Sequence, residues 1–297
     1  MRHVLKLLQA VIFSLFFANS LQAGEPQKGI ATLDWTVAET LIALGETPVA
    51  VGDVESYKKW VKFPTLPQSV KDLGIRLQPN SEQLVQLSHS LEAQPLQFIN
   101  TSFYAAVTPQ IEKFAEKVEM VDFYQEGDAW QNILNASEKI AELIEKPAAF
   151  QTLKQNYLQK IEEIRPLVAP YTARPIALVQ FIDTRHLRIY ATNSPFGAVL
   201  SQLGFHNAWQ GSQNHWGFEV IEVTQLAKLP ENSRFVIVKP YPHNIASALK
   251  YNIIWQHLAM AKDPLILPEV WTFGGIPSAQ RFAETLANGL LNGGEPW

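Results

Sequence analysis

Seven aromatic residues lie at sequence positions that favour contact with a ligand over packing in a hydrophobic core. They fall in predicted loops or at strand ends, where open α/β sheets hold ligands in a crevice. Simple loop packing is the alternative for any one tryptophan, but a concave aromatic site accounts better for the whole set. The set consists of Trp60, Phe103, Tyr104, Trp209, Trp216, Trp271 and Phe273.

One arginine stands out beside these aromatic residues. Arg76 lies between Ile75 and Leu77 in a predicted loop with few other charges. A guanidinium is costly there unless it meets an anionic or strongly polar partner. The sequence therefore predicts a ligand contact for Arg76, and the alternative is an ordinary surface arginine.

The motifs of the common enzyme classes are missing from the sequence. No GxGxxG, GxxxxGK[ST], GxSxG or HExxH occurs, so nothing indicates nucleotide binding, acyl transfer or zinc proteolysis. The chain has no cysteine, which excludes disulfides and thiolate chemistry. Its seven histidines include no pair four residues apart, so a metal cage is not indicated. His186 and His215 are interpreted as surface or hydrogen-bonded residues.

A long amphipathic helix is predicted over residues 147–169, with strands and helices alternating on both sides of it. Apolar residues recur there at spacings of three and four, and prolines mark both ends. Such a helix is roughly 30 Å long, about the diameter of a small domain. Because each half has its own strand–helix set, the helix is predicted to bridge two lobes rather than pack within one domain. The fold class is therefore α/β, with lobes at residues 24–146 and 170–297 after a leader at residues 1–23.

Local patterns add detail to each lobe. Each sheet is expected to be mostly parallel, because strands alternate with helices. Asp34, Asn80 and Asp128 are predicted to cap helices. Residues 57–63 predict an aromatic loop, and residues 245–260 predict one continuous helix.

Residues 1–23 have the build of a secretory signal peptide. Arg2 and Lys6 lead into an apolar run that ends in small and polar residues at Ala23. The run is too short for a comfortable membrane span, so cleavage is favoured over a retained anchor. The absence of cysteine also removes the acceptor of a lipoprotein anchor. We expect a soluble protein of a bacterial periplasm, and a net charge of −4 does not favour nucleic acid as a partner.

Five segments carry a family likeness, and they are residues 35–45 (WTVAETLIALG), 74–80 (GIRLQPN), 207–211 (NAWQG), 214–217 (NHWG) and 270–274 (VWTFG). Together they resemble the periplasmic ferric hydroxamate-binding proteins of bacterial siderophore ABC importers, over nearly all of the chain after the leader. The first segment is common to the wider class of iron-siderophore, haem and cobalamin binders. The tryptophan segments are more specific to hydroxamate binders.

The resemblance implies two lobes joined by one long rigid helix, with a shallow cleft between them and small closure on the ligand. It implies that Arg76 and Tyr104 contact the iron-bound hydroxamate oxygens, and Phe103 is adjacent to that tyrosine. It further implies an aromatic wall and cleft edge formed by Trp209, Trp216, Trp271, Trp60 and Phe273.

The resemblance also implies partners. Relatives present one surface glutamate on each lobe to an inner-membrane ABC permease, but Gln110 and Thr224 occupy the matching positions here. Glu112 and Glu222 lie close enough to substitute for them. The expected ligand is a pre-chelated ferric siderophore whose iron is already saturated by siderophore oxygens. The protein then needs aromatic contact and a few donors, with no cofactor and no metal ligand of its own.

The first hypothesis is therefore a non-enzymatic, monomeric carrier of ferric hydroxamate siderophores. Binding of haem, cobalamin or another ferric siderophore is the alternative within the class, and Tyr104 offers a possible axial ligand to haem. A secreted hydrolase is the alternative from another class. It requires a nucleophile or metal-bound water beside a base, and no motif supplies one.

Overall fold

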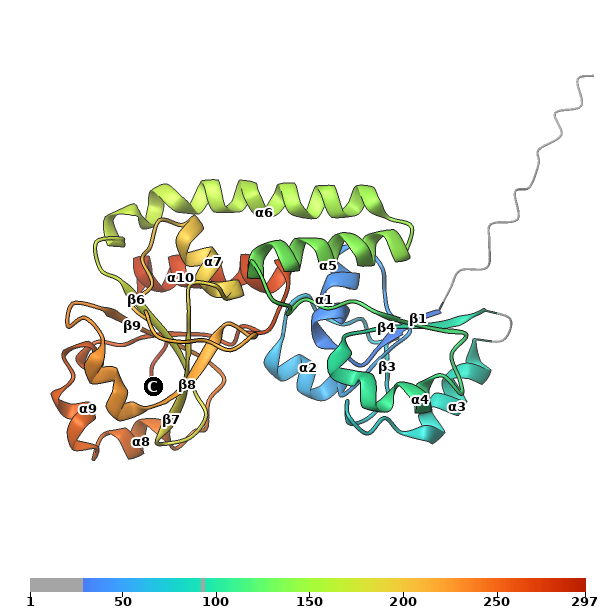
Figure 1. Ribbon diagram of the computed structural model, residues 1–297, viewed down its shortest axis with the longest axis horizontal. Coiled ribbons are helices and arrows are strands. Elements are labelled where there is room, and N and C mark those ends of the chain that lie inside the picture. Colours follow the sequence, from blue (N-terminus) through green and yellow to red (C-terminus); the bar gives the residue numbers. More distant parts are fainter. Residues whose placement is uncertain (1–28, 92–93) are drawn as a thin grey trace, which may run out of the picture.

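Two α/β lobes lie side by side under one long helix in the computed structural model, which describes residues 29–91 and 94–297 (Figure 1). The signal peptide predicted over residues 1–23 lies outside the described residues. None of the helices in the described part of the chain has the length and apolar character that a membrane crossing requires.

Five short strands form the sheet of the first lobe. All pair in parallel, which confirms the prediction for this half of the chain. The central strand is buried at every position because helices cover both faces of a parallel sheet. In spatial order the strands are β3 (Lys71–Asp72), β2 (Ala50–Val51), β1 (Gly29–Thr32), β4 (Leu96–Asn100) and β5 (Lys117–Met120).

Three helices of this lobe begin at the side-chain caps predicted from the sequence. Oxygens of Asp34, Asn80 and Asp128 accept hydrogen bonds from backbone N–H groups of the first turn that follows each of them. The helices of the lobe are α1 (Trp35–Ala43), α2 (Val54–Trp60), α3 (Ser81–Ser90), α4 (Thr108–Ile111) and α5 (Ala129–Leu143), with a 3-10 turn η1 (Ser102–Val107) before α4.

The sheet of the second lobe is mixed. Its spatial order is β10 (Leu265–Leu267), β9 (Arg234–Val238), β6 (Ile176–Phe181), β7 (His186–Tyr190) and β8 (Phe218–Glu222). The first three strands are parallel, whereas β7 and β8 are antiparallel to their neighbours. A tight turn joins β6 to β7, so this part of the sheet forms a hairpin where a parallel crossover was expected.

The helices of the second lobe are α7 (Pro195–Gln202), α8 (Ile245–Leu249), α9 (Ile253–His257) and α10 (Ile276–Asn292), with 3-10 turns η3 (Val223–Lys228) and η4 (Ala259–Lys262). The expected helix over residues 245–260 is wrong. The Asn252 side chain accepts from the N–H of Trp255 and begins a second helix, which divides the segment in two.

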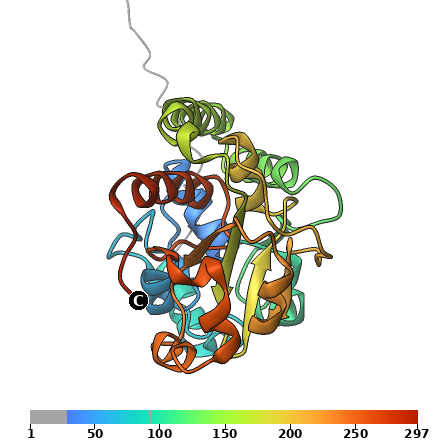
Figure 2. The ribbon, with the colours of Figure 1, turned by 90° about the vertical axis from the view of Figure 1, so that its left-hand side faces the viewer.

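The long helix α6 (Pro147–Val168) lies across both lobes, as the sequence predicted. It packs on α5 of the first lobe and on α10 of the second, and Figure 2 shows it almost end-on above the second lobe. Its buried residues Phe150, Tyr157, Ile161 and Ile164 form the expected apolar stripe. The helix thus joins the lobes along one side, while the exact lobe boundaries stay a prediction.

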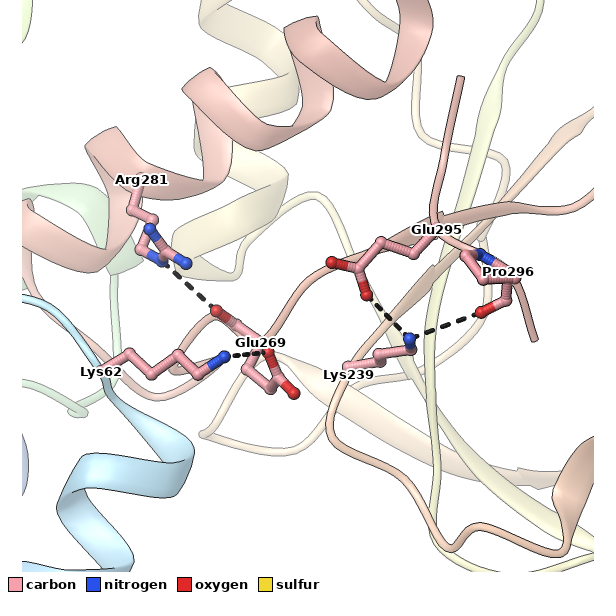
Figure 3. Close-up of polar contacts among 6 residues, drawn as sticks. All are labelled: Lys62, Lys239, Glu269, Arg281, Glu295 and Pro296. Atoms are coloured by element: carbon pink, nitrogen blue, oxygen red, sulfur yellow. Dashed lines mark hydrogen bonds and ion pairs between the residues drawn. The ribbon is translucent and has the colours of Figure 1, made fainter. Parts of the chain in front are cut away.

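Direct contacts also join the lobes. Figure 3 shows the ion pair between Lys62, just after α2, and Glu269, just after β10, at 2.6 Å. Both side chains are partly exposed, so this pair contributes at most about 1 kcal/mol. A buried link lies at Glu39 of α1, whose oxygens accept from Gly275 N and Ser278 Oγ at 2.5 Å each. Burial raises the pKa of Glu39 to about 8.

Residues 57–63 were predicted to form an aromatic loop, and this prediction is wrong for its first half. Residues Val54–Trp60 form α2, with the Asp53 carboxylate accepting from Ser56 N. Val54 and Tyr57 are buried three residues apart, which is helical spacing, and the neighbouring prolines concealed that pattern in the sequence. Trp60 is therefore the last residue of a helix.

Candidate functional site

A cavity of about 480 Å³ opens between the lobes, a volume within the range of small-molecule sites. On the first lobe its walls come from residues that follow strands of the parallel sheet: Asp34 after β1, Arg76 after β3, Tyr104 after β4 and Tyr124 after β5. The carboxyl ends of parallel strands meet at one edge of a sheet, so these side chains converge although they are far apart in the sequence.

Arg76 is the cation on the first-lobe side of the cavity. Its Nη1 donates to the Tyr104 hydroxyl at 2.9 Å, and its Cζ lies 3.7 Å from the centroid of the Trp35 ring. It forms no salt bridge within the part of the chain that the structure describes. Its positive charge is therefore held in place by neutral groups, and most of its five N–H donors remain for a ligand.

Two ionisable residues influence this arginine, Tyr104 by contact and Asp34 through its charge alone. Tyr104 is only 1% exposed, and burial raises the pKa of its hydroxyl, which stays neutral and holds Arg76 in place. Asp34 accepts from Thr36 N, Val37 N and Thr101 Oγ1 at 2.7–3.2 Å. Burial raises the pKa of Asp34, and those three hydrogen bonds and the charge of Arg76 partly offset the rise.

The aromatic wall centres on Trp216. The segment 214–217 is a tight turn in which Gly217 N donates to Asn214 O, and Gly217 has a φ of +80° that favours glycine. The turn holds the Trp216 ring 4.8 Å from that of Tyr124 and 6.1 Å from that of Phe103. Phe103 and Tyr124 come from the opposite lobe, so the wall continues across the cavity.

Trp271 and Phe273 follow β10 and are held by the first lobe. The Trp271 indole donates to Thr36 Oγ1 at 3.1 Å, and that hydroxyl donates to Phe273 O at 2.7 Å. The two rings lie 5.3 Å apart, and both line the cavity. Thr36 of α1 therefore fixes the position of this part of the wall relative to Arg76.

Sequence reasoning missed several residues of the cavity. Tyr124 lines it with a buried hydroxyl that has no hydrogen-bond partner among the described residues. Arg188 of β7 lines it from the second lobe, and the signal was available as a charge between the apolar residues Leu187 and Ile189 of a predicted strand. Phe218 and His215 also line it; His215 is exposed, as expected, but lies at the cavity.

Trp60 and Trp209 were expected at the site, but neither lines the cavity. Trp60 packs behind Trp271, with ring centroids 6.5 Å apart. Trp209 packs against the core of the second lobe, and its indole donates to Ser212 O at 2.9 Å. Segment 207–211 is tied to the second sheet, because Asn207 Nδ2 donates to Tyr190 O of β7.

The two glutamates predicted to dock a permease are exposed, Glu112 at the end of α4 and Glu222 at the end of β8. Glu222 Oε2 also accepts from Thr224 Oγ1 at 3.2 Å. Within residues 29–91 and 94–297 there is no cluster of three or more histidine, aspartate or glutamate side chains that could hold a metal ion. The groups that line the cavity are mainly aromatic rings, with two guanidinium groups, hydroxyls and the carboxylates of Asp34 and Asp122.

Two α/β lobes bridged by one helix, with an aromatic cavity between them, define a bilobal ligand-binding protein. The family model described as periplasmic binding protein matches residues 30–262, and the chain belongs to this family. This confirms the predicted class of protein.

Relatives resemble the chain over nearly its full length. It is 30% identical to the iron(3+)-hydroxamate-binding protein FhuD of Escherichia coli K12, over 96% of this chain and 95% of the relative. It is 24% identical to the achromobactin-binding periplasmic protein of Dickeya dadantii, over 84% and 79%. The structure resembles that of the Fe3+–Desferal-bound siderophore-binding protein FhuD from Vibrio cholerae, with a TM-score of 0.81 and 22% identity over 91% of this chain and 100% of that chain.

Proposed function

We propose that this protein binds ferric hydroxamate siderophores in the periplasm and delivers them to an inner-membrane ABC permease. The observation that carries the proposal is the pairing of Arg76 with Tyr104 in a cavity lined mainly by aromatic rings. The 30% identity with a hydroxamate-binding relative supports the ligand class.

The chemistry of the cavity suits such a ligand. Hydroxamate oxygens bound to Fe(III) retain partial negative charge, and a guanidinium offers parallel donors to neighbouring oxygens. Rings of Trp216, Trp271 and Phe273 cover the apolar scaffold that surrounds the iron. The iron arrives as cargo inside a complete coordination shell, so the protein contributes contacts to the outer face of that shell only.

The same features weigh against the alternatives. An axial tyrosinate to haem requires an accessible phenol oxygen, whereas Tyr104 is 1% exposed and its hydroxyl accepts from Arg76. A hydrolase requires an activated nucleophile, and the acidic cavity residues Asp34 and Asp122 already accept hydrogen bonds from their own lobe. We therefore assign the chain a carrier function without catalysis or a resident cofactor.

The remaining parts of the proposal concern the partner and the location. Exposed Glu112 and Glu222, one on each lobe, are the proposed permease contacts, because paired charges set orientation and association rate. The protein is proposed to act as a monomer after residues 1–23 are removed on export.

Intrinsic tryptophan fluorescence tests the proposal directly, because Trp216 and Trp271 line the cavity. Ferrichrome, ferrioxamine and ferric coprogen are titrated separately, and saturable quenching is expected with at least one of them. Absence of quenching with all three refutes the ligand class. A shift of the Soret band on mixing with haem identifies the haem alternative.

A further inference from the structure

Arg188 gives the cavity a second guanidinium, which comes from the second lobe, whereas Arg76 comes from the first. Arg188 lies on β7 of the second lobe and lines the same cavity. Its Cζ lies 5.4 Å from the centroid of the Phe218 ring and 5.5 Å from that of Phe273. These two aromatic contacts hold the cation at the cavity wall without neutralising its charge.

The polar support of Arg188 is also neutral. Its one hydrogen bond within the described residues runs from Nη1 to Gln180 Oε1 at 3.2 Å. Gln180 is 2% exposed, and its Nε2 donates to Pro240 O at 3.3 Å, which turns the amide oxygen toward the arginine. The Nε of Arg188 is buried and has no partner there. A guanidinium with one hydrogen bond and no salt bridge among the described residues keeps donors for a ligand that enters the cavity.

The acidic residues of the cavity do not compensate this charge through contact. Arg188 forms no salt bridge within residues 29–91 and 94–297. Asp34 accepts from Thr36, Val37 and Thr101, and Asp122 accepts from Ser102 N at 2.6 Å. Both carboxylates are thus engaged by the first lobe, and each lobe presents one guanidinium held by neutral groups.

From this arrangement we infer that Arg188 is a specificity-determining residue that binds a carboxylate of the ferric siderophore. The inference rests on the proposed function and refines its ligand class. A ferric trihydroxamate is neutral overall, and Arg76 alone suffices for its oxygens. A complex in which an α-hydroxycarboxylate replaces one hydroxamate has one net negative charge and presents a carboxylate beside the iron. Two guanidinium groups fit that ligand better than the neutral one.

Two probes separate the charge effect from the scaffold. Ferrichrome is the neutral trihydroxamate, and the iron complex of schizokinen, a citrate-based dihydroxamate, is the anionic ligand. For each probe the ratio of the variant's dissociation constant to that of the parent is measured by fluorescence, so the contribution of the scaffold cancels. Arg188→Gln should weaken binding of ferric schizokinen about 10- to 100-fold and that of ferrichrome less than about 3-fold.

Further variants test whether the charge of Arg188 causes the preference for the anionic complex. Arg188→Lys keeps the charge and should restore part of the preference for the anionic complex, whereas Arg188→Met should behave like Arg188→Gln. Arg185→Gln is the matched control, because Arg185 is an exposed arginine on the turn before β7, and it should change neither constant. Circular dichroism verifies the fold of each variant. If both neutral variants unfold, the parent still provides a test: added salt should weaken only the anionic complex, and equal salt dependence of the two probes overturns the inference.

Failure of the inference is distinguishable from failure of the proposed function. Equal weakening of both probes by Arg188→Gln, or no weakening of either, overturns the inference and leaves the carrier function intact. So does a parent chain that binds ferrichrome but not ferric schizokinen. A parent chain that binds neither probe refutes the proposed function, and the inference with it.

Discussion

Replacement of Arg76 tests the central polar contact of the proposed site. Inside the protein the side chain donates a hydrogen bond to Tyr104 at 2.9 Å, stacks on Trp35 at 3.7 Å and lies 6.0 Å from the centroid of the Trp271 ring. Loss of these contacts lowers the stability of the fold. A neutral hydrogen-bond partner and a cation–π contact of a half-buried arginine with a buried ring together account for about 1–2 kcal/mol of unfolding free energy.

The effect on affinity comes from the contacts with the ligand. A hydrogen bond to a charged partner contributes roughly 1.5–3 kcal/mol, so Arg76→Ala should raise the dissociation constant for every ferric hydroxamate by about one to two powers of ten. Arg76→Lys should weaken binding nearly as much, because one ammonium cannot hold the Tyr104 hydroxyl and also present parallel donors.

The assay is fluorescence titration with ferrichrome and ferrioxamine, accompanied by urea unfolding of the same variants. Arg185→Ala removes an exposed arginine and serves as the control for a general charge effect. An Arg76→Ala variant that remains folded and binds every hydroxamate as tightly as the parent refutes the reasoning. Arg76 would then be the surface residue of the alternative interpretation.

Three further predictions concern other parts of the molecule. Trp216→Ala should weaken binding to an extent that depends on the siderophore scaffold, because the substitution removes apolar contact. Trp209→Ala, outside the cavity lining, should leave the affinity nearly unchanged. Equal effects of the two variants in the same titration would contradict the geometry. Burial raises the pKa of Glu39 from 4.5 to about 8. Between pH 4.5 and 8 the folded state therefore keeps a proton on Glu39 that the unfolded state has lost, and the free energy of unfolding should fall as the pH rises from 5 to 8. Glu39→Gln should flatten this dependence in urea unfolding, and parallel pH profiles of parent and variant would count against it. Glu112→Gln with Glu222→Gln should lower transport while leaving siderophore affinity unchanged, and transport at the parent rate would show that docking uses other residues.

The sequence alone determined the features that depend on local spacing. Asp34, Asn80 and Asp128 cap their helices because a short polar side chain bonds to the N–H groups that directly follow it. The stripe of residues 147–168 likewise specifies a helix whose length reaches across two lobes. Residues after strands were recognised as site candidates since the carboxyl ends of strands in a parallel sheet lie at one edge.

Tertiary structure decided which of those candidates meet. Trp60 and Trp209 have the same local character as Trp216, yet they pack behind the wall or into the core, because their direction depends on elements remote in the sequence. Arg188 was visible in the sequence only as a charge within an apolar strand, because its partners Gln180, Phe218 and Phe273 come together only when the second sheet and the segment after β10 are assembled. Glu39 gained its raised pKa for the same reason, since only the packing of α10 against α1 buries it. Spacing along the chain specifies a helix face, whereas burial and charge at a site are properties of several chain segments together.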